Sequence, residues 1–246
     1  MGIRKHIIKF LYANLWLKKL AFNPLTEYHQ WRLLKFVRRT AAGIQADQSI
    51  IDVGAGELKY KPHFAHCHYI SNDLCIGDGD WNYAGIDIVS SAYDIPVETG
   101  SFDAALCIQV LEHLDSPDRA FQEFSRILKP HGRIYLSAPL LAGEHQQPHD
   151  FLRYTRYGYA LLGEKHGFRL VSIEPHGGSV IAVETLAWAA LWEMLPFRRQ
   201  TAPRYVIYLL LYPIKLLTGA LALLFDQLDR KNSMTINYDV TYEKSE

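Results

Sequence analysis

The sequence predicts an α/β fold in which a doubly wound, mostly parallel sheet of seven strands carries helices on both faces. Three observations support this prediction. Short apolar runs alternate with amphipathic segments between residues 46 and 178. The run at 104–108 is wholly apolar, as parallel strands covered on both faces tend to be. Glycines or acids follow several of these runs, and in such sheets ligands bind at the carboxyl ends of the strands.

Each strand is predicted from its apolar or alternating pattern. The expected strands cover 50–53, 67–71, 86–89, 104–108, 133–137, 168–173 and 236–242. In the last of these, Ile236, Tyr238, Val240 and Tyr242 alternate with polar residues, which predicts a half-exposed and antiparallel strand at the end of the sheet.

The expected helices begin and end at recognisable residues. Residues 3–21 suggest a basic amphipathic helix, and Thr26 can cap a second helix that Gly43 ends. Ser116, followed by proline and aspartate, starts a third. Thr155 caps a fourth that ends at Gly167. The domain organisation follows from these elements: 1–45 forms an N-terminal helical arm, 46–178 the core, 179–232 an apolar helical insertion, and 233–246 the final strand and tail.

The charges are balanced overall but unevenly placed. The formal net charge is zero, so no global field draws the protein to nucleic acid, and we expect no nucleic-acid partner. Residues 1–39 hold nine Lys or Arg and one acid, whereas 47–118 hold thirteen acids and two lysines. The basic arm either packs on the acidic domain or faces anionic lipid. Three cysteines match no zinc or disulfide pattern, so we expect a cytoplasmic protein, with peripheral attachment to the inner face of a membrane as an alternative.

The stretch SIIDVGAGELKY at 49–60 predicts a ligand-binding turn. Gly54 and Gly56 allow a sharp turn and a close approach to the backbone. Lys59 stands where a dinucleotide-binding turn has its third glycine, and Asp52 is poorly placed for phosphate but suits a cationic ligand. Asp73 follows the second strand and can accept both ribose hydroxyls. Asp94 can accept a bond from an adenine amino group, with Ile95 packing on the ring. These features predict an adenosine site without phosphate.

Several stretches in order then resemble the class I S-adenosylmethionine-dependent methyltransferases that act on small molecules, with a Rossmann-like fold. They are IIDVGAGELKY, SNDL, AYDIPVETGSFDAALCIQVLEHLDSP and FSRILKPHGRIYLSAPL. The resemblance covers about residues 45–175 and implies S-adenosyl-L-methionine as cofactor. It implies cofactor contacts at Asp52, Gly54, Gly56, Asp73, Asp94, Ile95 and Gln109. Leu58 departs from a frequent glycine in the family turn. Asp52 as a cap of backbone amides, Asp73 as a turn residue and Asp94 as an Asx-turn stay open.

The resemblance implies methyl transfer to a small-molecule, glycan or lipid-linked acceptor, with oxygen favoured as the methylated atom. A catalytically silent methyltransferase-like binding module, at a membrane or in a complex, is the alternative. A nicotinamide-dependent reductase is disfavoured by the missing third glycine and by Asp52.

A hydroxyl acceptor usually needs a base. The loop at 137–155 leaves the fifth strand and concentrates the candidates His149, His145 and Asp150. A structural hydrogen-bond network of this loop with Arg153 is the alternative. No metal is expected, because Gln109 replaces the first glutamate of the E-x-x-E-H motif that some related enzymes carry.

The segment at 205–225 is apolar and long enough to span a bilayer. Lys215 near its middle and Pro213 argue against a span. We therefore expect a helical insertion that packs over the substrate side or forms a homodimer surface. Peripheral contact with a membrane is the alternative.

Overall fold

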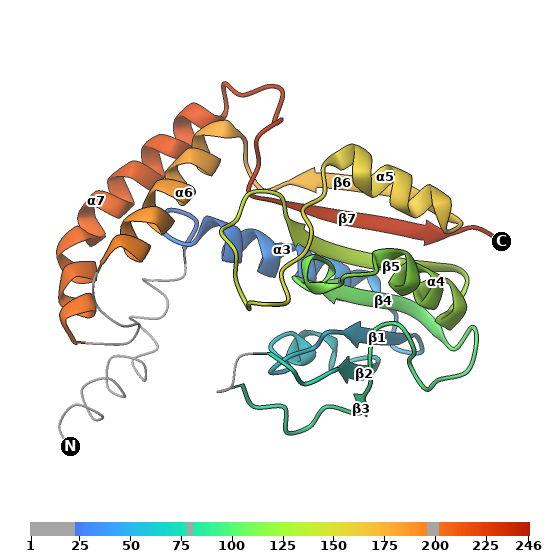
Figure 1. Ribbon diagram of the computed structural model, residues 1–246. Helices are drawn as coiled ribbons and strands as arrows, with labels where there is room; N and C mark the ends of the chain where they lie inside the picture. The colour runs from blue at the N-terminus through green and yellow to red at the C-terminus, as the bar shows by residue number, and fades with distance from the viewer. Residues whose placement is uncertain (1–22, 78–80, 196–201) are drawn as a thin grey trace, which may run out of the picture. The chain divides into compact units, whose positions relative to one another are not determined.

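The computed structural model describes residues 23–77, 81–195 and 202–246 (Figure 1). The helix predicted over 3–21 lies outside these residues. The described elements, in chain order, are α3 (Tyr28–Gly43), β1 (Ser49–Val53), the 3-10 helix η1 (Lys61–Phe64), β2 (His68–Asp73), β3 (Ile88–Val89), β4 (Phe102–Ile108), the 3-10 helix η2 (Leu111–His113), α4 (Pro117–Ile127), β5 (Leu128–Pro139), α5 (Arg156–Lys165), β6 (Phe168–Pro175), α6 (Ser179–Met194), α7 (Ala202–Asp226) and β7 (Asn237–Lys244).

The seven strands form one sheet in the order β3-β2-β1-β4-β5-β7-β6. The first five strands in this order are parallel, and β7 runs antiparallel to both of its neighbours. The predicted fold class is confirmed: a mostly parallel, doubly wound sheet with an antiparallel last strand and an apolar helical segment before it. The crossover between β1 and β4 creates the switch point at which ligands bind in such sheets.

The last strand is more deeply buried than its sequence suggests. We expected a half-exposed strand at the end of the sheet, but β7 lies between β5 and β6, and every residue from Asn237 to Tyr242 is buried. Its polar side chains are satisfied inside the sheet, since the Asn237 amide donates to the Ser137 hydroxyl at 2.7 Å and that hydroxyl donates to Asp239 at 2.7 Å. The prediction of a half-exposed strand was therefore wrong, because the polar half of the alternation pairs with a neighbouring strand instead of water.

Helices cover both faces of the sheet. On one face, Phe121 of α4 contacts the rings of Phe168 and Tyr242 edge-on, within a cluster that includes Ile134 and Leu136 of β5. Tyr135 points the other way, because successive strand residues alternate between faces, and there it meets Phe36 of α3. Thr155 caps α5 as predicted, accepting a bond from the Gly158 N–H.

The chain divides into two compact units. The sheet unit comprises Lys35–Pro175 and Thr235–Glu246. The described residues of the helical unit lie within Met1–Leu34 and His176–Met234. This unit contains helices α6 and α7, which lie side by side (Figure 1).

Candidate functional site

The turn after β1 needs glycine at two positions. Gly54 and Gly56 have φ angles of 78° and 54°, in the left-handed region that side chains disfavour. A Cβ at Gly54 would collide with Val110, and one at Gly56 would lie 3.2 Å from the ring of Trp81. Leu58, which replaces a frequent family glycine, also adopts a positive φ of 58°. The turn therefore keeps a glycine-like path although the third glycine is absent.

Asp73 ends β2 beside this turn. Its carboxylate accepts the Gly56 N–H at 2.8 Å and the Cys75 N–H at 2.6 Å. Two backbone bonds fix the orientation of the carboxylate, and Asp73 still lines the adjacent cavity. The structure thus brings Gly54, Gly56 and Asp73 together, as the sequence predicted.

A cavity of about 500 Å³ opens over the carboxyl ends of the first strands. That volume lies within the range of small-molecule and cofactor sites. Three aromatic rings that the sequence analysis did not single out contribute to its wall: Trp81, Tyr83 and Tyr93. The charged residues in its lining are three acids and one lysine: Glu57, Asp73, Asp115 and Lys59. An excess of acids favours a ligand that carries positive charge and disfavours a diphosphate.

Asp52 does not line this cavity, in contrast to the predicted contact with the ligand. Its side chain is buried and accepts a hydrogen bond of 2.6 Å from the hydroxyl of Tyr69. Burial raises the pKa of Asp52 to about 7, against the opposing effect of the Tyr69 bond. The alternative that Asp52 accepts bonds from nearby backbone amides is not what the structure shows, because its hydrogen bond comes from the Tyr69 side chain on β2. Asp52 therefore lies in the core next to the turn and not in the cavity wall.

Asp94 and Ile95 also lie outside the lining of the cavity. Asp94 is exposed, whereas Ile95 is buried and its N–H donates to Glu123 at 2.6 Å. The residues just before them, Ser91, Ala92 and Tyr93, line the cavity instead. The loop that holds Asp94 and Ile95 therefore reaches the cavity, but through residues one to three positions before Asp94.

Gln109 lies at the cavity, as predicted. It follows β4 with a φ of 57°, and its amide donates to Asn237 at 2.9 Å and to the Ser137 carbonyl at 3.2 Å. These bonds tie the end of β4 to β5 and β7.

Only one of the three predicted catalytic residues lines the cavity in the described structure. His149 does, whereas His145 and Asp150 do not. Asp150 pairs with Arg153 through bonds of 2.5 and 2.8 Å, and this pairing lowers its pKa to about 2. It also accepts the His145 N–H at 3.0 Å. A carboxylate with so low a pKa is a weak base, so Asp150 organises the loop, as the alternative interpretation proposed.

His113 is a cavity residue that we had not named as a candidate base. Its Nδ1 lies 2.5 Å from the carbonyl oxygen of His149, and because a carbonyl only accepts, Nδ1 must carry the proton. Nε2 is then left with its lone pair and without a hydrogen-bond partner among the described residues, but the atom is buried and lies 3.9 Å from a Glu112 carboxylate oxygen. Burial lowers the pKa of His113, which favours this neutral form. The VLEHL stretch was the available signal, since its histidine directly follows the strand-end loop.

Glu112 lies behind His113 with an unusual environment. Its side chain is fully buried, and neither carboxylate oxygen has a hydrogen-bond partner within the described part of the chain. Burial raises the pKa of Glu112 to about 8, so the neutral acid predominates at pH 7. Glu112, His113 and His145 could hold a metal ion, since their ligand atoms lie within 4.8 Å of one another. A protonated Glu112 needs no cation, and the absence of a metal stays a prediction.

Comparison with known proteins gives a consistent result. A family model described as a methyltransferase domain matches residues 51–136. A ubiquinone biosynthesis O-methyltransferase of Shewanella pealeana is 26% identical over 146 residues, which are 54% of this chain and 61% of that protein. The chain therefore spans about three fifths of the length of that relative. A tRNA (carboxymethyluridine(34)-5-O)-methyltransferase of Mus musculus is 28% identical over 145 residues, which are 53% of this chain and 20% of that protein.

The fold has solved counterparts. A SAM-dependent methyltransferase from Archaeoglobus fulgidus superimposes with a TM-score of 0.53 at 15% identity, covering 87% of this chain and 94% of that one. At this identity the likeness establishes the fold alone.

Proposed function

We propose that the chain is a class I S-adenosylmethionine-dependent methyltransferase and that it transfers a methyl group from that cofactor to a small-molecule, glycan or lipid-linked acceptor, at oxygen; the match of a methyltransferase-domain model to residues 51–136 supports this. The observation that carries this proposal is the cavity in which the glycine turn and Asp73 meet. The whole activity, the acceptor and the methylated atom belong to the proposal.

The residues present fit the cofactor of this family. The backbone of the Gly54–Gly56 turn is open to a close approach, and the fixed carboxylate of Asp73 can accept two ribose hydroxyls. Ser91, Ala92 and Tyr93 form the part of the wall where the adenine ring would pack. When bound, S-adenosylmethionine supplies a methyl group activated by a cationic sulfur. The acidic lining of the cavity favours that charge.

The protein's contribution to methyl transfer is placement and removal of a proton. An in-line displacement needs donor and acceptor held near attack distance with water excluded. A hydroxyl acceptor also has to lose its proton, and two imidazoles line the cavity, those of His113 and His149. We favour His149 as the base, because its exposed imidazole lines the cavity, whereas the unprotonated Nε2 of His113 is buried beside Glu112. The backbone carbonyl of His149 also holds the His113 ring in place.

The charge of the cavity lining and the activities named for two relatives support the proposed acceptor class. Three acids against one lysine would repel a polyanionic acceptor such as tRNA, although one relative is a tRNA methyltransferase. The relative named for ubiquinone biosynthesis is an O-methyltransferase, which supports oxygen as the acceptor atom.

The test uses radiolabelled S-adenosylmethionine, the full chain and a cell extract that is afterwards separated into lipid, glycan, small-molecule and nucleic-acid pools. We expect label in one of the first three pools with the native chain and none with Asp73→Ala. Label in the nucleic-acid pool would contradict the acceptor class. Tight cofactor binding in calorimetry without transfer into any pool would favour a silent binding module, and binding of NADH in place of S-adenosylmethionine would contradict the proposal altogether.

A further inference from the structure

Helix α7 presents a continuous apolar face to the outside of the helical unit. Five side chains at helical spacing are between 44% and 72% exposed: Leu210, Ile214, Leu217, Leu221 and Leu224. They recur every three to four residues, so they lie along one side of the helix. Soluble proteins rarely expose so long an apolar stripe unless it binds something.

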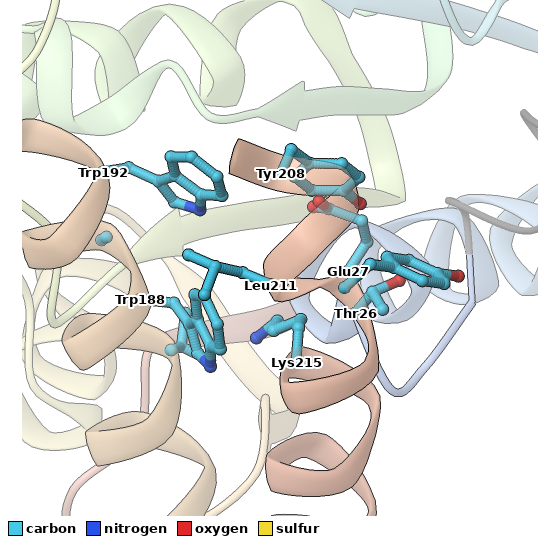
Figure 2. Close-up of a pocket in the computed structure, with 10 residues that line it drawn as sticks. Thr26, Glu27, Trp188, Trp192, Tyr208, Leu211 and Lys215 are labelled. Carbon is cyan, nitrogen blue, oxygen red and sulfur yellow. The ribbon is translucent and has the colours of Figure 1, made fainter. Parts of the chain in front are cut away.

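The charge in the middle of α7 is turned away from this face. Lys215 is the only charged residue between 206 and 225. Its ammonium donates to both carboxylate oxygens of Glu184 on α6 at 2.8 Å, and each of these two side chains is only 13% exposed. Figure 2 shows Lys215 beside Trp188 in a small cavity of the helical unit, and the ammonium lies 5.5 Å from the centre of that ring. The ion pair therefore leaves the outward face without charge.

Other polar groups near α7 also find partners inside the unit. Trp188 donates its ring N–H to the Thr218 hydroxyl at 3.0 Å, and that hydroxyl also bonds Glu184 at 2.9 Å. Asp226 accepts the Gly178, Val180 and Ile181 N–H groups, at the start of α6. An apolar environment on the outward side would thus leave none of these groups unsatisfied.

The length and hydropathy of the segment match a bilayer better than a protein core. Val206–Asp226 has 21 residues with a mean hydropathy of 1.9, and only 11% of its most apolar window is buried within the structure. A core helix of the same composition would be mostly covered. The inner side of α7 is already occupied, since Gly219 lies so close to the backbone of Leu25 that a Cβ would collide with it. One free apolar face is the pattern of a helix that lies in a membrane interface, not of one that crosses it.

The neighbouring sequence is basic, which indicates the sign of the lipid. Residues 196–204, which immediately precede and begin α7 in the sequence, contain Arg198, Arg199 and Arg204 and no acid. Clusters of this kind next to an apolar helix are attracted to anionic headgroups. Trp192 and Tyr208, whose ring centres lie 5.7 Å apart, stand toward the same end of the two helices, and such amphipathic rings are enriched at membrane interfaces.

We propose that the outward face of α7 docks on a lipid bilayer that contains anionic lipid, with the helix lying in the interface. The occupant of the face is the bilayer surface rather than a second copy of the chain. The apolar contact supplies affinity, and the basic residues supply the preference for anionic lipid. This inference concerns the helical unit and does not depend on methyl transfer.

Flotation of the full chain with vesicles tests it. Vesicles of phosphatidylcholine mixed with phosphatidylglycerol should carry the chain upward in a density gradient, and pure phosphatidylcholine vesicles should carry much less. The double variant Leu210→Glu/Leu217→Glu places two charges on the docking face and should lower the vesicle-bound fraction about tenfold or more. Leu161→Glu is the matched control, since Leu161 is 67% exposed on α5 of the sheet unit, and it should float as the native chain does. Far-UV circular dichroism and urea unfolding serve as the checks that each variant is folded.

Several outcomes would overturn the proposal. No flotation with either vesicle, or equal loss for Leu161→Glu, would contradict docking through α7. Equal flotation with both vesicles would contradict the anionic preference. Retention of the bound chain after an alkaline carbonate wash would indicate a spanning helix. A lipid-free dimer in sedimentation that the double variant dissociates, together with no flotation, would assign the face to a second copy of this chain.

Discussion

The two units of the chain place apolar and polar side chains in opposite ways. In the sheet unit, Phe121 and Tyr242 are fully buried, and the polar groups gather at the strand ends beside the cavity. In the helical unit, leucines of α7 face outward while the Glu184–Lys215 pair is turned inward. The sheet unit is thus stabilised by burying its own apolar surface, whereas the α7 face gains nothing from burial until another apolar phase covers it. We therefore expect the chemical reaction in the sheet unit and membrane attachment through the helical unit.

The largest expected effect concerns the chemical half of this comparison. Asp73→Ala should weaken binding of S-adenosylmethionine at least a hundredfold in Kd, because the carboxylate proposed to accept two ribose hydroxyls is lost together with its bond to the Gly56 N–H. Isothermal calorimetry measures this directly. Asp94→Ala is the matched control, since Asp94 is an exposed acid in a neighbouring loop that does not line the cavity. Near-native affinity of Asp73→Ala, or a comparable loss in Asp94→Ala, would contradict the placement of the site.

A second prediction separates the two imidazoles of the cavity. His149→Ala should lower turnover about a hundredfold or more while sparing cofactor affinity, because it removes the proposed base. His113→Ala should have a smaller effect, since the His113 Nε2 is buried beside Glu112. Transfer of labelled methyl into the active pool is the readout. If only His113→Ala reduces turnover, the base is His113 and not His149.

The sequence predicted those parts of the site whose determinants are local. Gly54, Gly56 and Asp73 directly follow strands that are short and apolar, so their position at the sheet edge could be inferred. Asp52 was misplaced because its partner, Tyr69, comes from the neighbouring strand β2. The burial of β7 was missed for the same reason, since Ser137 on β5 satisfies Asn237. No local pattern shows that Trp81 reaches Gly56 across the turn.

The third prediction concerns the helical unit. Glu184→Gln should destabilise the chain by about 2 kcal/mol, because it leaves the Lys215 ammonium largely buried without a counter-charge. The double variant Glu184→Gln/Lys215→Met removes both charges and should recover most of that loss. Urea unfolding followed by tryptophan fluorescence is suitable, since Trp188 lies beside the pair. A double variant as unstable as the single one would mean that the ion pair is not what holds these two side chains.

The last prediction depends on pH and lies in the sheet unit. Burial raises the pKa of Glu112 from the ordinary value of 4.5 to about 8, so the folded chain keeps a proton that the unfolded chain releases. The stability contributed by this group is therefore fully present below about pH 4.5 and is lost as the pH rises toward 8. Glu112→Gln cannot ionise, so it should match the native chain near pH 4.5 and exceed its stability by more than about 1 kcal/mol above pH 8 in urea unfolding. Other titrating groups, such as Asp52, are common to both chains and cancel in the difference.

If a cation on Glu112, His113 and His145 held the carboxylate instead, the native chain would be the more stable one at high pH and would lose stability on addition of EDTA. The sign of the difference between the two chains above pH 8 therefore decides whether a proton or a metal ion satisfies the buried acid.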